Sequence, residues 1–192
     1  MRLAPLVALA VLSACTSDPM RSHPANADIQ HEVARVVEAI RHETGTALYS
    51  DLRKLVAYDV FAVDKVAGLA NDSNARLRSN AMWVLAQIRD NEQPAIMDRI
   101  DRTLRGALGD GDPTVRYEAA AGLAARGHWD VLPELIGGLE SDDSGIRFRC
   151  HDQLLATTSR DFGYLVDGTV EEREIAIAKW RHWYMDWRVS RS

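Results

Sequence analysis

The sequence predicts an all-α protein built from repeated helical hairpins. Residues with high helix propensity dominate, and only 6 of the 192 residues are proline, so little in the composition interrupts helices. Apolar residues make up 46% of the chain and charged residues 27%, which is the balance of one globular domain with a buried core. One spacing of apolar residues also recurs three times with a helical period. These observations favour about three helical hairpins flanked by capping helices.

Residues 1–14 have the features of a secretory signal peptide. Arg2 supplies a positive end, an apolar stretch runs over residues 3–11, and Ser13 and Ala14 form a small-residue cleavage region. The apolar run of about ten residues is half of the roughly 20 needed to cross a bilayer as a helix. The segment is therefore expected to be removed and not to remain as a membrane anchor.

The residues Leu12-Ser13-Ala14-Cys15 resemble the bacterial lipobox. The resemblance implies that Cys15 receives a diacylglycerol on its thiol and becomes the mature N-terminus. Several acyl chains on one terminus anchor a protein stably, whereas a single chain does not. Thr16, and not aspartate, follows the cysteine, which by resemblance to the enteric sorting rule favours the outer membrane, facing the periplasm. The alternative is an ordinary secretory signal that happens to contain a cysteine.

Residues 15–28 are expected to form a lipidated flexible tether. They include Pro19 and Pro24, several small polar residues and almost no large apolar ones, so the globular part is expected to begin near Ile29. Once Cys15 is lipidated, Cys150 is the remaining cysteine, and an intramolecular disulfide is impossible in the mature monomer. Stability must then come from packing.

The charge of the mature chain disfavours nucleic acid as a partner. Loss of Arg2 with the signal leaves 22 basic residues against 28 acidic ones. A chain with this excess of acidic residues lacks the basic surface that phosphate backbones require. It also offers no polybasic patch for anionic lipid head groups, so membrane attachment is expected to depend on the acyl chains.

Residues 29–59 are expected to form two N-terminal capping helices separated near Gly45. Their apolar positions recur three and four residues apart, as on one face of a helix. These positions are Ile29, Val33, Val36, Val37 and Ile40 in the first helix and Leu48, Leu52, Leu55 and Val56 in the second. Repeat arrays need such end helices because a terminal repeat has no neighbour to cover its apolar face.

Residues 60–158 contain three segments, 70–85, 108–123 and 139–154, that align without a gap. Each has an Asp-rich turn, then an aliphatic residue followed by arginine, a small residue four positions after the aliphatic one, and a leucine eight positions after it. An apolar residue upstream of each turn (Val66, Leu104 and Leu135) predicts a first helix before each second helix. Pro94 and Pro133 are expected near first-helix starts, and Gly127 is expected to end a second helix.

The segment from Asp110 to Leu123, with the pattern Asp-x-x-x-x-Val-Arg-x-x-Ala-Ala-x-x-Leu, resembles the HEAT-like repeat family, particularly its short bacterial (PBS-lyase-type) form. The third copy departs from it at Cys150 and His151. The resemblance implies an α-solenoid of about three HEAT-like helical hairpins with N- and C-terminal capping helices. It also implies that turn aspartates and arginines form a structural ladder between repeats. The ladder residues are Asp72, Arg78, Asp110, Arg116, Asp142 and Arg147.

Residues 159–192 are expected to form a loop and a Trp-rich capping helix. Thr169 and Glu172 have the spacing of a capping box that opens this helix. One face carries Ile177, Trp180, Tyr184 and Trp187, and Trp183 lies at its edge. A core role is the expectation for tryptophans at helical spacing, and a carbohydrate-binding or membrane-binding role is the alternative.

The sequence contains no motif that indicates catalysis or a cofactor. The six histidines are scattered, without the paired spacing of transition-metal ligands. The residues Asp110-Gly-Asp112 begin like a calcium loop but lack its glycine at the sixth position and its glutamate at the twelfth. No Gly-x-Ser-x-Gly turn supports a nucleophile. The protein is therefore expected not to be an enzyme.

The second helices carry the candidate binding residues on the side away from their shared apolar face. In HEAT-like solenoids the second helices line the concave side, which would place Trp83, Tyr117 and Phe148 there, with Glu118 and Arg149 adding charge selectivity. Aromatic anchors among polar residues are typical of protein-binding hot spots. The alternative is that these aromatics lean onto neighbouring repeats.

The sequence thus predicts an envelope lipoprotein that acts as a non-catalytic protein–protein interaction scaffold, with an unidentified envelope protein or peptide as partner. One alternative is a small-ligand-binding or enzymatic protein with a pocket between the repeats and the C-terminal helix, lined by His151, Asp152, Tyr164 and His182. Another is a structural, self-assembling subunit.

Overall fold

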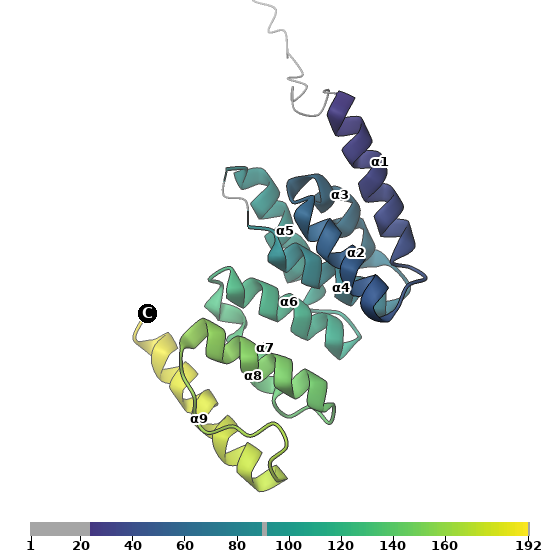
Figure 1. Cartoon of the computed structure of the whole chain (residues 1–192). Helices are drawn as coiled ribbons and strands as arrows, with labels where there is room; N and C mark the ends of the chain where they lie inside the picture. The colour runs from purple at the N-terminus through teal and green to yellow at the C-terminus, as the bar shows by residue number, and fades with distance from the viewer. Residues whose placement is uncertain (1–23, 90–91, 192) are drawn as a thin grey trace, which may run out of the picture.

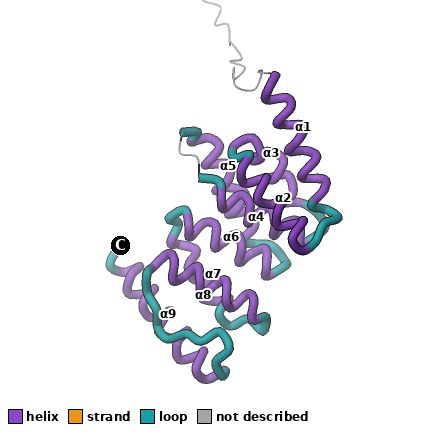
Figure 2. The backbone as a smooth tube through the Cα atoms, in the orientation of Figure 1, coloured by secondary structure: helices purple, strands orange, loops and turns teal. Residues whose placement is uncertain are grey.

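The computed structural model describes residues 24–89 and 92–191, and this part of the chain is helical without a strand (Figure 2). The all-α prediction is confirmed. The signal peptide, Cys15 and residues 16–23 of the expected tether lie outside the described residues. The helices are α1 (Pro24–Ala39), α2 (Gly45–Ala57), α3 (Val60–Gly68), α4 (Ala75–Gln87), α5 (Pro94–Ala107), α6 (Pro113–Ala125), α7 (Leu132–Gly138), α8 (Ser144–Thr158) and α9 (Val170–Val189).

The helices pack in two rows (Figure 1). The even-numbered helices contact one another in succession, α2 on α4, α4 on α6 and α6 on α8. On the other side, α1 packs on α3, α3 on α5 and α7 on α9. Each odd-numbered helix from α1 to α7 also packs against the even-numbered helix that follows it in the chain. The chain therefore advances by helix pairs, with α9 as the last described helix.

The recurring apolar positions form the core that joins these pairs. In the second repeat segment Val115, Ala119 and Leu123 are buried, as are their counterparts in α4 and α8. The upstream residues Val66, Leu104 and Leu135 are fully buried on the first helices of the pairs. The spacing in the sequence thus predicted correctly which side chains leave water. Full burial of a valine, leucine or isoleucine side chain stabilises the fold by about 1.5–3 kcal/mol.

One arginine of each repeat segment closes the turn before its own helix. The Nη1 atoms of Arg78 and Arg116 each donate to the carbonyl oxygen six residues earlier at 2.9 Å and to the next carbonyl at 3.3 Å. Arg147 Nη1 donates to the two corresponding carbonyl oxygens, both at 2.9 Å. These bonds satisfy backbone acceptors that have no partner in a helix. The recurrence explains why the same residue type is needed in every copy.

The turn residues act as helix caps. Asn74, Asp112 and Asp143 occupy equivalent N-cap positions, and their side chains accept hydrogen bonds from backbone N–H groups in the first turn of α4, α6 and α8. Two residues before each cap, Asp72, Asp110 and Ser141 accept from the backbone N–H of the cap residue. Capping therefore accounts for the Asp-rich composition of these turns.

Ion pairs link three neighbouring turns, though not through all the residues expected. Arg41 contacts Asp72 at 2.7 Å, and Arg78 holds Asp110 with two bonds of 2.7 Å. Arg116 contacts Glu134 at 3.3 Å instead of an aspartate of the third turn. In that turn Ser141 stands where Asp72 and Asp110 stand in the others. Asp142 contributes only its carbonyl oxygen, to Arg147.

The helix boundaries expected from glycine and proline are confirmed. α5 begins at Pro94, Pro133 lies in the first turn of α7, and α6 ends before Gly127, whose φ is +89°. After α6, the N–H groups of Gly127 and His128 donate to Ala124 and Leu123, which is a Schellman motif. The start of α1 differs from the expectation. It begins at Pro24 inside the predicted tether, because proline is tolerated in a first helical turn and alanines follow it.

The C-terminal helix begins at the predicted capping box. The Thr169 side chain accepts from the Glu172 backbone N–H, and the Glu172 side chain accepts from the Thr169 backbone N–H. Ile177 and Trp180 are buried, and the ring of Trp180 meets Phe162 edge-on with centroids 4.7 Å apart. Trp183 is half-buried between Trp180 and Phe162. These tryptophans therefore contribute to the core, as expected.

Candidate functional site

The five predicted binding residues lie on α4, α6 and α8, which pack side by side. Phe148, on α8, is the most exposed of the three predicted aromatics, with 59% of its surface accessible. Arg149 follows it and reaches back to α6, where its Nη1 atom lies 2.7 Å from Glu118 Oε1. Consecutive residues of α8 thus provide an exposed apolar ring and one member of an ion pair that joins α8 to α6. We call Phe148, Arg149 and Glu118 the α6/α8 patch.

The two charges of the α6/α8 patch differ in exposure. The Glu118 side chain retains only 11% of its accessible surface, whereas Arg149 retains 51%. Burial raises the pKa of Glu118, and the Arg149 cation opposes this rise. The Arg149 cation therefore offsets the cost of burying the Glu118 carboxylate, while its guanidinium group keeps N–H donors for another acceptor. The sequence suggested Glu118 as a surface charge; that it is nearly buried follows from the close packing of α6 on α8.

Tyr117 lies at the junction between repeats. Its ring is half-buried, and its Cδ1 atom would lie 3.2 Å from a Cβ atom on Gly138 of α7. The Arg116 guanidinium sits 5.8 Å from the ring centroid, and burial raises the pKa of the phenol. This arrangement matches the alternative in which the aromatic side chain leans onto the neighbouring repeat. Tyr117 is therefore packed between α6 and α7, and Phe148 is the predicted aromatic residue that stays exposed.

Trp83 is also half-buried, and it packs beside Tyr49, an aromatic residue that the sequence pattern did not indicate. Its ring centroid lies 6.1 Å from that of Tyr49 on α2, which is largely exposed. Tyr49 lies on α2, outside the three aligned segments, so their shared register did not point to it. The exposed Tyr49 and the half-buried Trp83 form a second aromatic group on the even-numbered helices.

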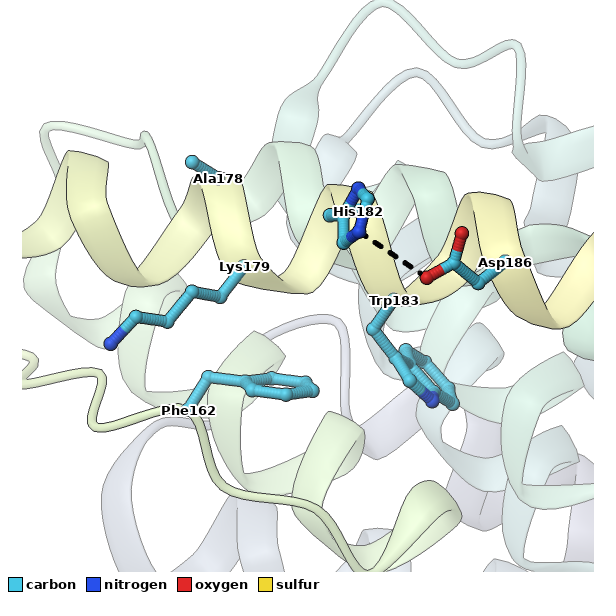
Figure 3. A pocket seen from close by; sticks show the side chains of 6 residues that line it. All are labelled: Phe162, Ala178, Lys179, His182, Trp183 and Asp186. Carbon is cyan, nitrogen blue, oxygen red and sulfur yellow. Dashed lines mark ion pairs between the residues drawn. The ribbon is translucent and has the colours of Figure 1, made fainter.

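A pocket beside the C-terminal helix was the alternative candidate site, and the depression found there has mostly different lining residues from those expected. An open, shallow depression of about 580 Å³ lies beside α9 and is lined by Phe162, Ala178, Lys179, His182, Trp183 and Asp186 (Figure 3). Of the four expected residues, His182 lines it. Tyr164 is buried and donates its hydroxyl to Leu139 at 2.6 Å, and the ring of His151 packs 5.1 Å from that of Tyr164. Burial lowers the pKa of His151.

Residues 24–89 and 92–191 contain neither an assembled metal site nor a helix that could span a membrane. In this part of the chain no group of histidine, cysteine and acidic side chains is arranged to hold a metal ion. Its helices also include none long and apolar enough to span a membrane. The buried thiol of Cys150 has its pKa raised to about 12, mainly by desolvation, so the thiolate nucleophile is suppressed at neutral pH.

The comparisons with known proteins leave the chain without an assigned family. No family model matches it, and no curated protein matches its sequence.

Proposed function

We propose that the described helices form an α-solenoid of HEAT-like hairpins. Three features support this architecture: the register shared by the three segments, the two rows of successively packed helices, and the arginine that closes each turn. α1 and α2 cap one end and α9 caps the other. In such an array each repeat is stabilised mainly by its neighbours, which leaves one long face free for a partner.

We also propose that the protein is a lipoprotein of the bacterial envelope, anchored through Cys15 to the outer membrane and facing the periplasm. The lipobox-like residues before Cys15 support this anchor. Eight residues separate Cys15 from the start of α1. At about 3.5 Å per extended residue they span no more than about 30 Å, so the helical domain would stay close to the membrane surface.

On this scaffold, we propose that the face of the even-numbered helices binds an envelope protein or peptide without catalysing a reaction. The observation that carries the proposal is the α6/α8 patch, in which exposed Phe148 adjoins the Arg149–Glu118 ion pair. Aromatic residues, phenylalanine among them, and arginine are enriched in protein–protein interfaces relative to the rest of the surface. The partner expected from this chemistry presents an apolar side chain for Phe148 and a carboxylate for the free donors of Arg149.

The test is affinity capture of the full chain from its native membrane after crosslinking. The variant Phe148→Ala/Arg149→Gln removes both contacts and keeps a polar partner for Glu118. The control is Leu165→Ala, because Leu165 lies in the loop between α8 and α9 and not on these helices, and its exposed fraction of 58% nearly equals the 59% of Phe148. The proposal predicts a partner that the native chain and the control retain and the double variant loses. A partner captured equally by all three would contradict it.

A further inference from the structure

α9 has an outer face that no described helix covers. Its inner side, with Ile177 and Trp180, is buried in the domain. The opposite side is exposed along its length and is less polar than a solvent-facing helix surface usually is. It carries Ile175, Ala178, His182, Met185 and Val189. We call these five residues the outer stripe.

The spacing of the outer stripe is that of a coiled-coil seam. Successive members are three, four, three and four residues apart, so they occupy a and d positions of two heptads. Ile175, Met185 and Val189 are between 58% and 73% exposed, although each would be stabilised by leaving water. At 1.5 Å per residue the stripe is about 21 Å long, which is enough for several layers of contact with another helix.

The charges beside the outer stripe are complementary to those of a second, parallel copy of α9. In this register Glu174 and Arg181 occupy g positions, and Lys179 and Asp186 occupy the following e positions. In a parallel pair each g residue meets the e residue five positions later on the other helix. Glu174 would then face the partner's Lys179, and Arg181 would face the partner's Asp186. An antiparallel pair would also form attractive contacts, of Lys179 with the partner's Asp186 and of Glu174 with the partner's Arg188, but it would bring the two Arg181 side chains together. The parallel pair has no such contact between like charges.

The side chains concerned lie at the surface. Within the described part of the chain Lys179 has no polar partner, and Asp186 has only His182, at 3.4 Å. Arg181 contacts Glu140 at 2.8 Å, but both side chains are about half exposed, and such a surface pair is exchanged at little cost. These charged side chains could therefore pair with those of a second α9 while the domain stays folded.

The depression beside α9 borders the same edge of the outer stripe. Lys179 and Asp186 line it together with the rings of Phe162 and Trp183 (Figure 3). An arginine side chain that crosses from a partner helix to Asp186 would lay its alkyl stem and guanidinium over these rings. The depression is thus placed to receive the partner's Arg181.

We propose that α9 is a self-association surface, through which two copies of this chain pair in parallel. The experiment is sedimentation of the full chain in a mild detergent, from about 1 µM to about 500 µM. The native chain is expected to shift from monomer to dimer within this range. A mass that stays monomeric throughout would overturn the proposal.

Two sets of variants test the surface and its orientation. Met185→Glu should abolish the dimer, whereas Leu165→Glu, at an equally exposed apolar residue outside α9, should not. Glu174→Lys and Lys179→Glu should each weaken association about tenfold. The double variant Glu174→Lys/Lys179→Glu should restore it, and a mixture of the two single variants should form heterodimers. A dimer insensitive to Met185→Glu overturns the surface, and a double variant without rescue overturns the parallel arrangement.

Discussion

At the residue scale, the stability of the domain depends on polar contacts that leave little trace in the sequence. Arg147 is buried and donates to three carbonyl oxygens, those of Ser141, Asp142 and Val166. A carbonyl oxygen exists at every position, so the spacing of residue types cannot reveal which one an arginine will reach. The recurrence of arginine was predictable from the sequence, whereas its backbone acceptors required the fold.

Replacing Arg147 by methionine should lower the free energy of unfolding by about 2–4 kcal/mol, because three carbonyl oxygens lose their donor while the apolar stem is kept. The control Arg102→Met removes an exposed arginine from α5 and should change stability by less than about 0.5 kcal/mol. Urea unfolding followed by circular dichroism measures both. Equal losses of stability in the two variants would show that the hydrogen bonds from Arg147 to the carbonyl oxygens do not stabilise the domain.

Two adjacent glycines of α7 should respond in opposite directions to alanine. A Cβ atom on Gly138 would overlap Cys150 Sγ and press on Tyr117, whereas none of the described atoms lies within 4 Å of one on Gly137. Gly138→Ala should therefore destabilise by about 1–3 kcal/mol, and Gly137→Ala should stabilise by up to about 1 kcal/mol. Adding Cys150→Ala to Gly138→Ala should recover part of the loss. Thermal unfolding of the three variants measures these effects. Equal stability of Gly138→Ala and Gly137→Ala would contradict the close contact of Gly138 with Cys150.

Glu118 makes stability depend on pH in a definite direction. Since burial raises its pKa in the folded state, the folded chain binds this proton more tightly than the unfolded chain does, and stability is lost as pH rises through the folded pKa. The variant Glu118→Gln removes that loss. Its free energy of unfolding relative to the native chain should therefore increase between about pH 4 and about pH 7. Urea unfolding of both proteins at the two pH values measures this difference in the free energy of unfolding. A difference that stays constant or falls between the two pH values would contradict the prediction.

At the element scale, the helices and their ends were largely predictable, and their mutual contacts were not. Capping residues, prolines and the terminal glycine act within a few residues of where they stand, so their roles followed from local patterns. Tyr117 illustrates the limit. The helical period indicated that it points away from the shared apolar positions of α6, but its contact with Gly138 depends on how α7 approaches α6, which spacing along one helix does not determine.

Two threonine-to-alanine changes should separate capping from helix propensity. Thr169→Ala removes the cap of α9 and should cost about 1 kcal/mol. Thr103→Ala lies inside α5, where the hydroxyl donates to the Arg99 carbonyl and alanine is the better helix former, so stability should stay the same or rise slightly. Chemical denaturation of both variants provides the comparison. A similar loss in each would mean that the capping box contributes nothing specific.

At the scale of the whole molecule, the array of helix pairs would link the proposed N-terminal lipid anchor to the proposed binding face. The succession of helix pairs could be predicted from three aligned segments of sequence. The exposure of the residues proposed to bind a partner could be predicted only in part: Phe148 is exposed, whereas Trp83 and Tyr117 are half-buried, and the pattern did not point to the exposed Tyr49. Exposure depends on which neighbour covers a position, and this is a property of the assembled array.

The proposed lipid anchor on Cys15 predicts where the protein is found after cell fractionation. Native chain should sediment with membranes, and Cys15→Ser should move it to the soluble fraction, because the acyl chains provide the attachment. A native chain found in the soluble fraction would favour the ordinary secretory signal instead. A Cys15→Ser variant that stays with the membrane would point to attachment through another part of the protein.

The central claim is tested most directly by a photoactivatable amino acid placed at position 148, with position 165 as the exposed control. We expect irradiation of intact cells to join position 148 to a discrete partner, with the product lost when Arg149→Glu is added and absent at position 165. No product at 148, or the same products at both positions, would contradict the assignment of the α6/α8 patch as the binding site.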